Sequence, residues 1–363
     1  MAAADLADVE DATRALVEFD AHARGALAGD WGEDDFDLGP MSAILLRTES
    51  ASSSQIEQLT TSAGQLALAE LGEASGANAE TVLGNVRAME AALRLADELT
   101  VDSVLAMHRE LLLRQPLLTE EAGRFRTEQV WIGPGEAGPR TAEFVPPHHS
   151  RVADGIADVL AFAHRDDLPV LVQVALAHAQ FETIHPFVDG NGRTGRALAQ
   201  SMVRNKGLVV SATVPVSAGL LVDTERYFGA LGDFRAGDAG PIVRRFAAAA
   251  RIAVATGTTL VDDLVAVLAE SRALLEGTRA HATARRLLPH FLAQPIVTAK
   301  HLRGALGIGE MAALRALGTL SDRGVLRERT GRARGRVWEH PGVLEALDAY
   351  AETIRRMGVR GGR

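Results

Sequence analysis

Twelve consecutive residues, HPFVDGNGRTGR at 185–196, bring together one His, one Asp, one Asn, two Arg and three Gly. Pro186 disfavours helical geometry in the residue before it, so His185 should end the apolar helix that precedes it and face a loop. Helical spacing resumes at about Gly192, which places the loop directly before a helix N-terminus. Converging backbone N–H groups and the positive end of a helix dipole favour a bound phosphate there.

The charged residues of this stretch suit phosphoryl-group chemistry. Arg193 and Arg196 are three apart, so both project from the first helical turn and can hold phosphate oxygens. Asp189 offers a hard oxygen ligand for Mg2+, which usually takes one or two carboxylates together with phosphates and water. His185 can act as general base on an attacking hydroxyl. Each feature alone is common in structural roles, but their conjunction in one window predicts a nucleotide site.

Composition and charge limit what kind of protein can carry this site. The chain has 363 residues, 47% of them hydrophobic and 23% charged, which is typical of a globular protein with a substantial core. A net charge of −9 argues against a protein whose whole surface binds nucleic acid or acidic lipid. The absence of cysteine excludes disulfides, thiolate metal sites and cysteine nucleophiles. The acidic N-terminus and the interrupted apolar run at 246–260 favour a cytoplasmic protein with no membrane partner.

Most of the chain repeats apolar residues at three- and four-residue intervals, which predicts a mainly α protein. Thr100 stands where an N-cap is expected, and residues 23–40 are rich in Gly and Asp, which predicts an extended arm. Two short β-prone runs, 130–132 and 143–145, flank a Gly- and Pro-rich connection and predict a hairpin with a long tip.

The C-terminal region differs from the rest in charge and pattern. Residues 281–363 carry 15 Lys or Arg against 7 Asp or Glu. The pattern predicts a helix, a turn at 307–309, a second helix from Glu310 to about Asp322 and a basic hairpin, as in a winged helix. The second helix has one Arg and no Asn, Gln or Lys to read base edges, so we favour a protein-interaction or dimer role over DNA binding.

The sequence also resembles the Fic family, whose pattern H-P-F-x-D-G-N-G-R-x-G-R is matched at every specified position. Similarity to this family extends over about residues 40–260 and implies a helical core with a β-hairpin flap. The flap would pair with an extended segment of a target protein, and Val130, Trp131, Ile132 and Gly133 would lie in it. Family members with the complete pattern transfer AMP from ATP to a Ser, Thr or Tyr hydroxyl of a protein.

The resemblance implies a role for each residue of the pattern. His185 would deprotonate the target hydroxyl and Asp189 would bind Mg2+. Arg193 would hold the β- and γ-phosphates and Arg196 would contact the γ-phosphate. The phosphates would be cradled by Gly190, Asn191 and Gly192.

A second stretch, ESASSSQIEQL at 49–59, resembles the inhibitory helix that many Fic proteins carry, with the pattern [S/T]-x-x-x-E-[G/N]. Ser53 and Glu57 have this spacing, whereas Gln58 stands where the family has Gly or Asn. In the family the glutamate pairs with the last arginine of the pattern, here Arg196. The pair would take the place that the γ-phosphate needs, so we expect a self-inhibited enzyme.

We therefore predict a Fic-type helical core with a flap and a C-terminal winged helix-turn-helix domain. The expected divisions are an N-terminal arm with the inhibitory helix and first core helices at 1–110, a catalytic core at 111–260, a linker helix at 261–285 and the winged helix at 286–363. The expected activity is AMP transfer from ATP with Mg2+ to a protein hydroxyl, with self-modification and a homodimer both open. The alternatives are removal of AMP, transfer of another nucleotide, and a DNA-binding regulator with a nucleotide-sensing core.

Overall fold

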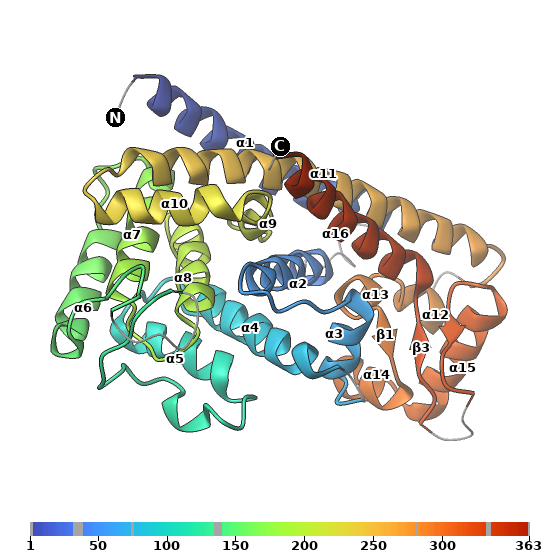
Figure 1. Ribbon diagram of the computed structural model, residues 1–363. Coiled ribbons are helices and arrows are strands. Elements are labelled where there is room, and N and C mark those ends of the chain that lie inside the picture. Colours follow the sequence, from blue (N-terminus) through green and yellow to red (C-terminus); the bar gives the residue numbers. More distant parts are fainter. Residues whose placement is uncertain are drawn as a thin grey trace.

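The computed structural model describes residues 3–31, 39–73, 76–133, 140–279, 282–331 and 335–361. The fold is mainly α-helical, as predicted, with one small sheet near the C-terminus (Figure 1). The helices before the histidine loop are α1 Ala3–Trp31, α2 Gly39–Ile56, α3 Ala63–Glu70, α4 Ala77–Arg94, α5 Val101–Leu112, α6 Val152–Ala163 and α7 Val170–Ile184. Those that follow it are α8 Asn191–Asn205, α9 Val216–Leu221, α10 Thr224–Arg235 and α11 Gly240–Leu274.

The N-terminal helix α1 lies along the long helix α11 at the upper edge of the molecule (Figure 1). The expectation of an extended arm at 23–40 is wrong for residues 23–31, which continue α1, and for residues 39–40, which begin α2. Residues 32–38 lie outside the described part of the chain. Apolar side chains spaced along α1, among them Leu16 and Phe19, are buried and join the main core. Burial of this apolar stripe stabilises helix α1. This stabilisation outweighs the low helix propensity of the Gly and Asp residues, which had suggested an irregular segment.

Helix α11 runs without a break across residue 260, where a boundary between core and linker was predicted. Over the described residues it is the one helix whose length and apolar composition would suffice to cross a membrane, because it extends beyond the apolar run at 246–260 on both sides. The same test is passed by core helices of proteins outside membranes. Here α11 packs against α1, α9 and α16, and Phe246, Leu260 and Leu264 are buried in that contact region.

The C-terminal part consists of short helices around a three-stranded antiparallel sheet. Its elements are α12 Thr283–Arg286, α13 His290–Ala293, β1 Ile296–Val297, α14 Ala299–Leu306, α15 Glu310–Asp322, β2 Arg327–Glu328, β3 Trp338–Glu339 and α16 Pro341–Gly361. The strand order is β1-β3-β2, with Val297 and Glu328 both opposite Trp338. Helix, turn, helix and hairpin thus follow each other at the predicted positions, an arrangement consistent with a winged helix.

Helix α2 lies at the centre of the molecule, between the core helices and the C-terminal part (Figure 1). It contacts α4, α8 and α9 on the core side and α13 on the other. Two side chains of α4 and α9 fix it by buried hydrogen bonds. Asn85 donates to the Ser50 carbonyl at 2.8 Å, and the Ser217 hydroxyl donates to the Glu49 carboxylate at 2.6 Å.

Candidate functional site

The histidine loop lies between α7 and α8, as the sequence predicts. α7 ends at Ile184, and His185 follows in the left-handed conformation with φ 50°. His is among the residue types that tolerate this region, and the following Pro186 disfavours continuation of the helix. Gly190, also left-handed at φ 81°, is the N-cap of α8. Left-handed residues thus stand at both ends of the loop, which brings His185 and the N-terminus of α8 into one short segment.

Two side chains hold the interior of this loop. Asn191 accepts a hydrogen bond from the Phe187 N–H at 2.8 Å and donates to the Phe187 carbonyl at 2.9 Å. The His108 ring stacks on Phe187 with ring centroids 3.6 Å apart. Because His108 Nδ1 accepts from the Gly123 N–H, its Nε2–H donates to the Asp189 carbonyl at 3.0 Å. Burial lowers the pKa of His108 to about 4, so the ring stays neutral and keeps both bonds.

The family resemblance implied that Asn191 cradles phosphates, but its side chain is engaged within the loop. Its backbone N–H still stands at the first position of α8, where helix N–H groups lack intrahelical partners. The Asn191 side chain thus shapes the cradle, and the backbone is the part that can contact an anion.

Arg126, which the sequence analysis did not single out, braces the loop against the base of the expected flap. Its guanidinium donates to the carbonyls of His185 at 2.8 Å, Glu128 at 2.9 Å and Pro147 at 2.5 Å, and to that of Ile184 at 3.4 Å. Planar donors in a fixed fork suit such a cluster of carbonyls. The side chain is buried, so these bonds are shielded from water. One residue thereby sets the position of His185 relative to the segment that precedes the flap.

His185 has the properties of a general base. Its side chain keeps about one fifth of its surface exposed, and burial lowers its pKa to about 4. It is therefore neutral near pH 7 and able to accept a proton. Glu182, one turn earlier on α7, lies with its carboxylate 4.0 Å from His185 Nδ1.

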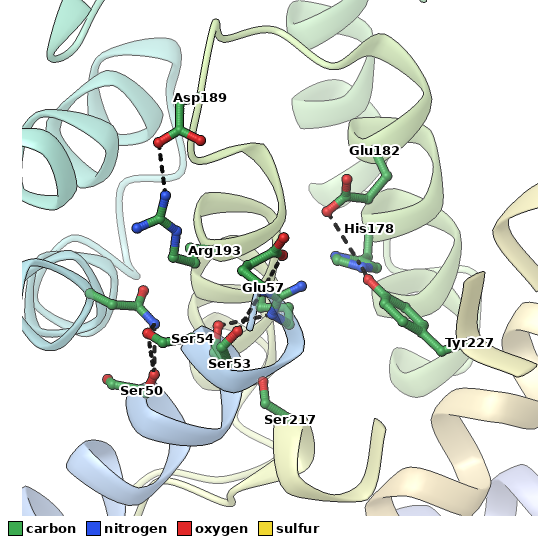
Figure 2. Close-up of polar contacts among 12 residues, drawn as sticks. Ser50, Ser53, Ser54, Glu57, His178, Glu182, Asp189, Arg193, Ser217 and Tyr227 are labelled. Carbon is green, nitrogen blue, oxygen red and sulfur yellow. Dashed lines mark hydrogen bonds and ion pairs between the residues drawn. The ribbon is translucent and has the colours of Figure 1, made fainter. Parts of the chain in front are cut away.

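A buried polar group continues from Glu182 into the core (Figure 2). Burial raises the pKa of Glu182 to about 7 and lowers that of His178 to about 3. His178 Nε2 hydrogen-bonds the Tyr227 hydroxyl at 2.7 Å. Tyr227 lies on α10 and is buried in the main core. Its side chain contributes to the position of α7 and α10 rather than to an open site.

Arg193 is buried, and only one of its nitrogens has a partner. Its Nη2 donates to Asp189 at 2.9 Å, whereas Nε and Nη1 have no partner among the described residues. Leaving guanidinium donors unsatisfied in a buried position is costly. Figure 2 shows the Asp189 carboxylate and the Arg193 guanidinium facing each other beside the N-terminal end of α8. Nε and Nη1 of Arg193 could therefore donate hydrogen bonds to a bound anion.

Arg196 is also buried but is fully engaged by α2. Its Nε donates to the Ser53 hydroxyl and its Nη2 donates to the Ser53 carbonyl and to Glu57 Oε1, each at 2.8 Å. Burial opposes the charge on Arg196, but the combined effect of Glu57, Tyr227 and Glu182 outweighs burial and raises the pKa of Arg196. The structure thus brings together Ser53, Glu57 and Arg196, as the resemblance implied.

The Glu57 carboxylate also covers the N-terminus of α8. A Cβ atom built on Gly192 would lie 2.1 Å from Glu57 Oε1, so a side chain at this position would collide with the carboxylate. Glycine allows an acceptor to approach the exposed N–H groups of the first turn. A negatively charged group therefore already occupies the position at which the sequence predicted phosphate.

The predicted flap is only partly within the described residues. Ile132 and Phe144 form a single antiparallel bridge, in which the Ile132 N–H donates to the Phe144 carbonyl at 2.8 Å. Val130 is half-buried, Trp131 is 43% exposed and Gly133 has φ 153°, a conformation that favours glycine. Residues 134–139, the predicted tip, lie outside the described part of the chain. The described flap is therefore a bridge rather than a two-stranded hairpin.

Among the described residues, no group of three or more His, Asp or Glu side chains lies close enough to hold a metal ion by itself. Asp189 is the only carboxylate of the loop, and its side chain is 45% exposed. A single accessible carboxylate fits a Mg2+ ion that takes its remaining ligands from phosphates and water.

The loop between α7 and α8 places a neutral histidine close to a helix N-terminus, an arrangement that favours a bound anion. Residues 98–203 match the sequence profile of the Fic/DOC family. This similarity covers the histidine loop and the helices on either side of it.

Similar proteins share part of the chain. The protein adenylyltransferase fic-1 of Caenorhabditis elegans is 31% identical over 169 residues, which cover 43% of this chain and 30% of the relative. The protein adenylyltransferase Fic of Nematostella vectensis is 28% identical over 155 residues, 42% of this chain and 32% of the relative. This chain thus spans about a third of the length of these curated relatives.

Solved structures show the same fold over a longer stretch. A Fic family protein from Desulfovibrio desulfuricans G20 superposes with a TM-score of 0.51 at 23% identity and covers 90% of this chain and 95% of its own. A Fic-1 fragment from Caenorhabditis elegans gives a TM-score of 0.50 at 23% identity over 70% of this chain and 72% of its own.

Proposed function

We propose that this protein is a Fic-type adenylyltransferase that transfers AMP from ATP to a hydroxyl of a protein. The observation that carries the proposal is the pair of unpartnered Arg193 donors, which lie at the N-terminus of α8. Buried guanidinium donors without acceptors favour a multiply charged anion over a neutral ligand. The names of the curated relatives, both protein adenylyltransferases, support a nucleotide as that anion.

In this proposal, His185 removes the proton from a Ser, Thr or Tyr hydroxyl of the target, which is another protein or a second copy of this chain. The freed oxygen forms a bond to the α-phosphorus of ATP, and the bond from that phosphorus to the bridging oxygen breaks. Pyrophosphate leaves with the bond's electron pair, and AMP stays on the target. Arg193 and the N-terminus of α8 stabilise the charge that collects on the departing phosphates.

Asp189 is the residue that would hold Mg2+, which neutralises phosphate charge when it is bound. To bind the ion, the Asp189 carboxylate has to give up its hydrogen bond with Arg193. Arg193 would then be free to contact phosphate with all of its donors. The exposed position of Asp189 and its single ion pair make this exchange inexpensive.

We further propose that Glu57 keeps the enzyme inactive. Its carboxylate holds Arg196 and covers the backbone of Gly192, which are two of the contacts that a γ-phosphate would use. A charge-assisted hydrogen bond contributes about 1.5–3 kcal/mol. Removal of Glu57 should therefore raise transfer by about 10- to 150-fold, at about 1.4 kcal/mol for each factor of ten.

The test uses ATP labelled in its α-phosphate, with Mg2+ and cell lysate, and compares wild type, Glu57→Gly and Glu57→Gly with His185→Ala. Label on protein should appear chiefly with Glu57→Gly and disappear in the double variant. ATP labelled in its γ-phosphate is the control, because AMP transfer leaves no γ-label on protein. Equal transfer by wild type and Glu57→Gly would remove Glu57 from the mechanism.

If nucleotide binds but no sample is labelled, removal of AMP becomes the better assignment. The measurement is then release of AMP from a pre-modified target by the wild-type protein. In that reaction Glu57 would be required rather than inhibitory, so the two activities respond to Glu57→Gly in opposite directions.

The alternative of a DNA-binding regulator receives no support from the basic hairpin. Arg327 and Arg329 both pair with the buried Glu339, and Arg336 pairs with Glu328. Intramolecular partners reduce the positive charge that is left for DNA phosphates. Arg332 and Arg334 lie outside the described residues. We therefore propose protein contact for this domain, and a shifted mobility of duplex DNA at low salt would contradict this assignment.

A further inference from the structure

A cavity of about 610 Å³ lies outside the histidine site, between α2, α3 and α16. Its volume is in the range of ordinary small-molecule pockets, about 300–1,000 Å³. Pro295 and Leu221 complete its wall, so the cavity joins the core to the C-terminal part of the chain. None of the residues of the histidine loop lines it.

The cavity and the active site share helix α2. The side of α2 that faces the cavity contributes Thr48, Ala51, Ser52 and Gln55. These positions are spaced i, i+3, i+4 and i+7 and therefore form one helical stripe. The residues that bind Arg196 or Asn85 form a different stripe, made of Ser50, Ser53, Ser54 and Glu57 at the C-terminal end of the helix. One helix thus separates an open cavity from the arginine that it covers.

The lining of the cavity is amphipathic, with a positive balance of charge. Apolar side chains, among them Leu66, Leu347 and Ile354, form a large part of its surface. The charged residues in the lining are Arg47, Arg355 and Asp348.

The charged side chains in the lining differ in their surroundings. Arg47 donates to Gln294 and pairs with Glu70 through Nη2, and its buried Nη1 has no partner among the described residues. Burial raises the pKa of the Asp348 carboxyl. The guanidinium groups of Arg47 and Arg355 beside apolar walls suit an anionic head group on an apolar body.

We propose that this cavity binds a small amphipathic anion, a carboxylate, sulfonate or phosphate with an apolar body, and that the bound molecule holds α2 against Arg196. The cavity exists in the conformation in which Glu57 covers α8. A ligand that binds only this conformation stabilises it, and at one hundred times its dissociation constant it shifts the equilibrium about 100-fold. The regulatory half of this proposal rests on the proposed adenylyl transfer, whereas the binding half does not.

Binding is tested with anilinonaphthalene sulfonate, an apolar anion whose fluorescence rises in apolar pockets. Ala351 on α16 lines the cavity, and Ala349 on the same helix is exposed and lies outside the lining. Ala351→Trp should abolish saturable fluorescence or raise the dissociation constant at least tenfold, whereas Ala349→Trp should leave it at the wild-type value. Equal urea midpoints of the two variants exclude misfolding as the cause. Equal fluorescence titrations of the two variants would overturn the site.

A second pair of variants tests the charge. Arg355 and Arg356 both bond to Glu352, but only Arg355 lines the cavity. Arg355→Met should weaken binding of the sulfonate by about threefold or more, and Arg356→Met should not. Octanoate should displace the sulfonate and octylamine should not. Displacement by both compounds at equal concentration would overturn the anionic class of ligand.

The regulatory half is tested by adding octanoate to the transfer assay. Residual transfer by wild type should fall by at least tenfold at saturation, while Glu57→Gly should be unaffected because it has no carboxylate to hold in place. Unchanged wild-type transfer at saturating octanoate would overturn the coupling. Absence of transfer even in Glu57→Gly would instead count against the proposed enzyme activity, and the fluorescence titrations would still decide the binding site.

Discussion

The turn that ends α2 offers the sharpest test of how Glu57 is positioned. The Leu59 N–H donates to the Ser54 carbonyl and the Gln58 N–H donates to the Gln55 carbonyl, at 3.0 and 2.9 Å. This pair of bonds is the Schellman motif, which requires a left-handed residue just past the helix end. Gln58 takes that position with φ 62°. Glycine or asparagine would adopt it at lower cost.

The expected size of the effect follows from two opposing contributions. A left-handed conformation costs a residue other than glycine about 1–2 kcal/mol. Replacement by glycine removes this cost, but the released chain then gains about 0.5–1 kcal/mol of conformational freedom. The net gain for the docked turn in Gln58→Gly is therefore about 1 kcal/mol, a factor of about five in the ratio of docked to released states. Because the Gln58 side chain is exposed, its removal should cost no packing energy.

Two measurements check this expectation. Gln58→Gly should lower residual AMP transfer about fivefold and slow hydrogen exchange of the Leu59 amide by a similar factor. The control is Gln58→Ala, which shortens the side chain but keeps the Cβ atom and the strained backbone. If Gln58→Gly and Gln58→Ala behave alike in both assays, the strain argument is wrong. The exchange measurement remains informative even in the absence of transferase activity.

Three further changes test the framework of the loop. Arg126→Lys should lower the free energy of unfolding by about 2–3 kcal/mol and transfer at least tenfold, because an ammonium cannot reach four carbonyls; urea titration and the transfer assay measure these effects. Asn191→Asp should lose the bond donated to the Phe187 carbonyl and destabilise the protein by about 1–3 kcal/mol, while Asn205→Asp provides a comparison at the other end of α8. His108→Gln should change the pH dependence of stability. The unfolded ring takes up a proton below its ordinary pKa of 6.5 and the folded ring only near 4, so the stability due to its neutral form is lost as pH falls through this window. The wild type should therefore lose up to about 1.4 kcal/mol more per pH unit than the variant, and parallel urea midpoints would contradict the assignment.

Local sequence patterns predicted the parts of the site that depend on near neighbours. Pro186 and the glycines after Asp189 correctly marked the end of α7 and the start of α8. Thr100 caps α5. α14 ends just before the turn at 307–309, and α15 begins just after it. These features depend on residues within one or two helical turns, and such positions carry strong conformational preferences.

Contacts between distant segments could not be read in the same way. Arg126 binds carbonyls on either side of the loop, and nothing in its immediate sequence distinguishes it from other arginines. Glu182 and Tyr227 belong to a buried group assembled from α7 and α10, whose partners depend on how the helices pack. The pairing of Glu57 with Arg196 spans 139 residues and was predicted only because the family resemblance connected the two segments.

If Glu57 inhibits the enzyme as proposed, the two arginines of α8 would still allow the site to admit a nucleotide. Glu57 satisfies Arg196 but leaves Nε and Nη1 of Arg193 without partners. A triphosphate carries enough oxygens to satisfy both side chains, whereas one carboxylate cannot. Glu57 has the advantage of being part of the same chain, so it competes at a high effective concentration. The outcome of the competition between Glu57 and the triphosphate depends on how stably α2 is held in place. Small changes at Gln58 or in the cavity that α2 lines should therefore alter activity, although they are not in the histidine loop.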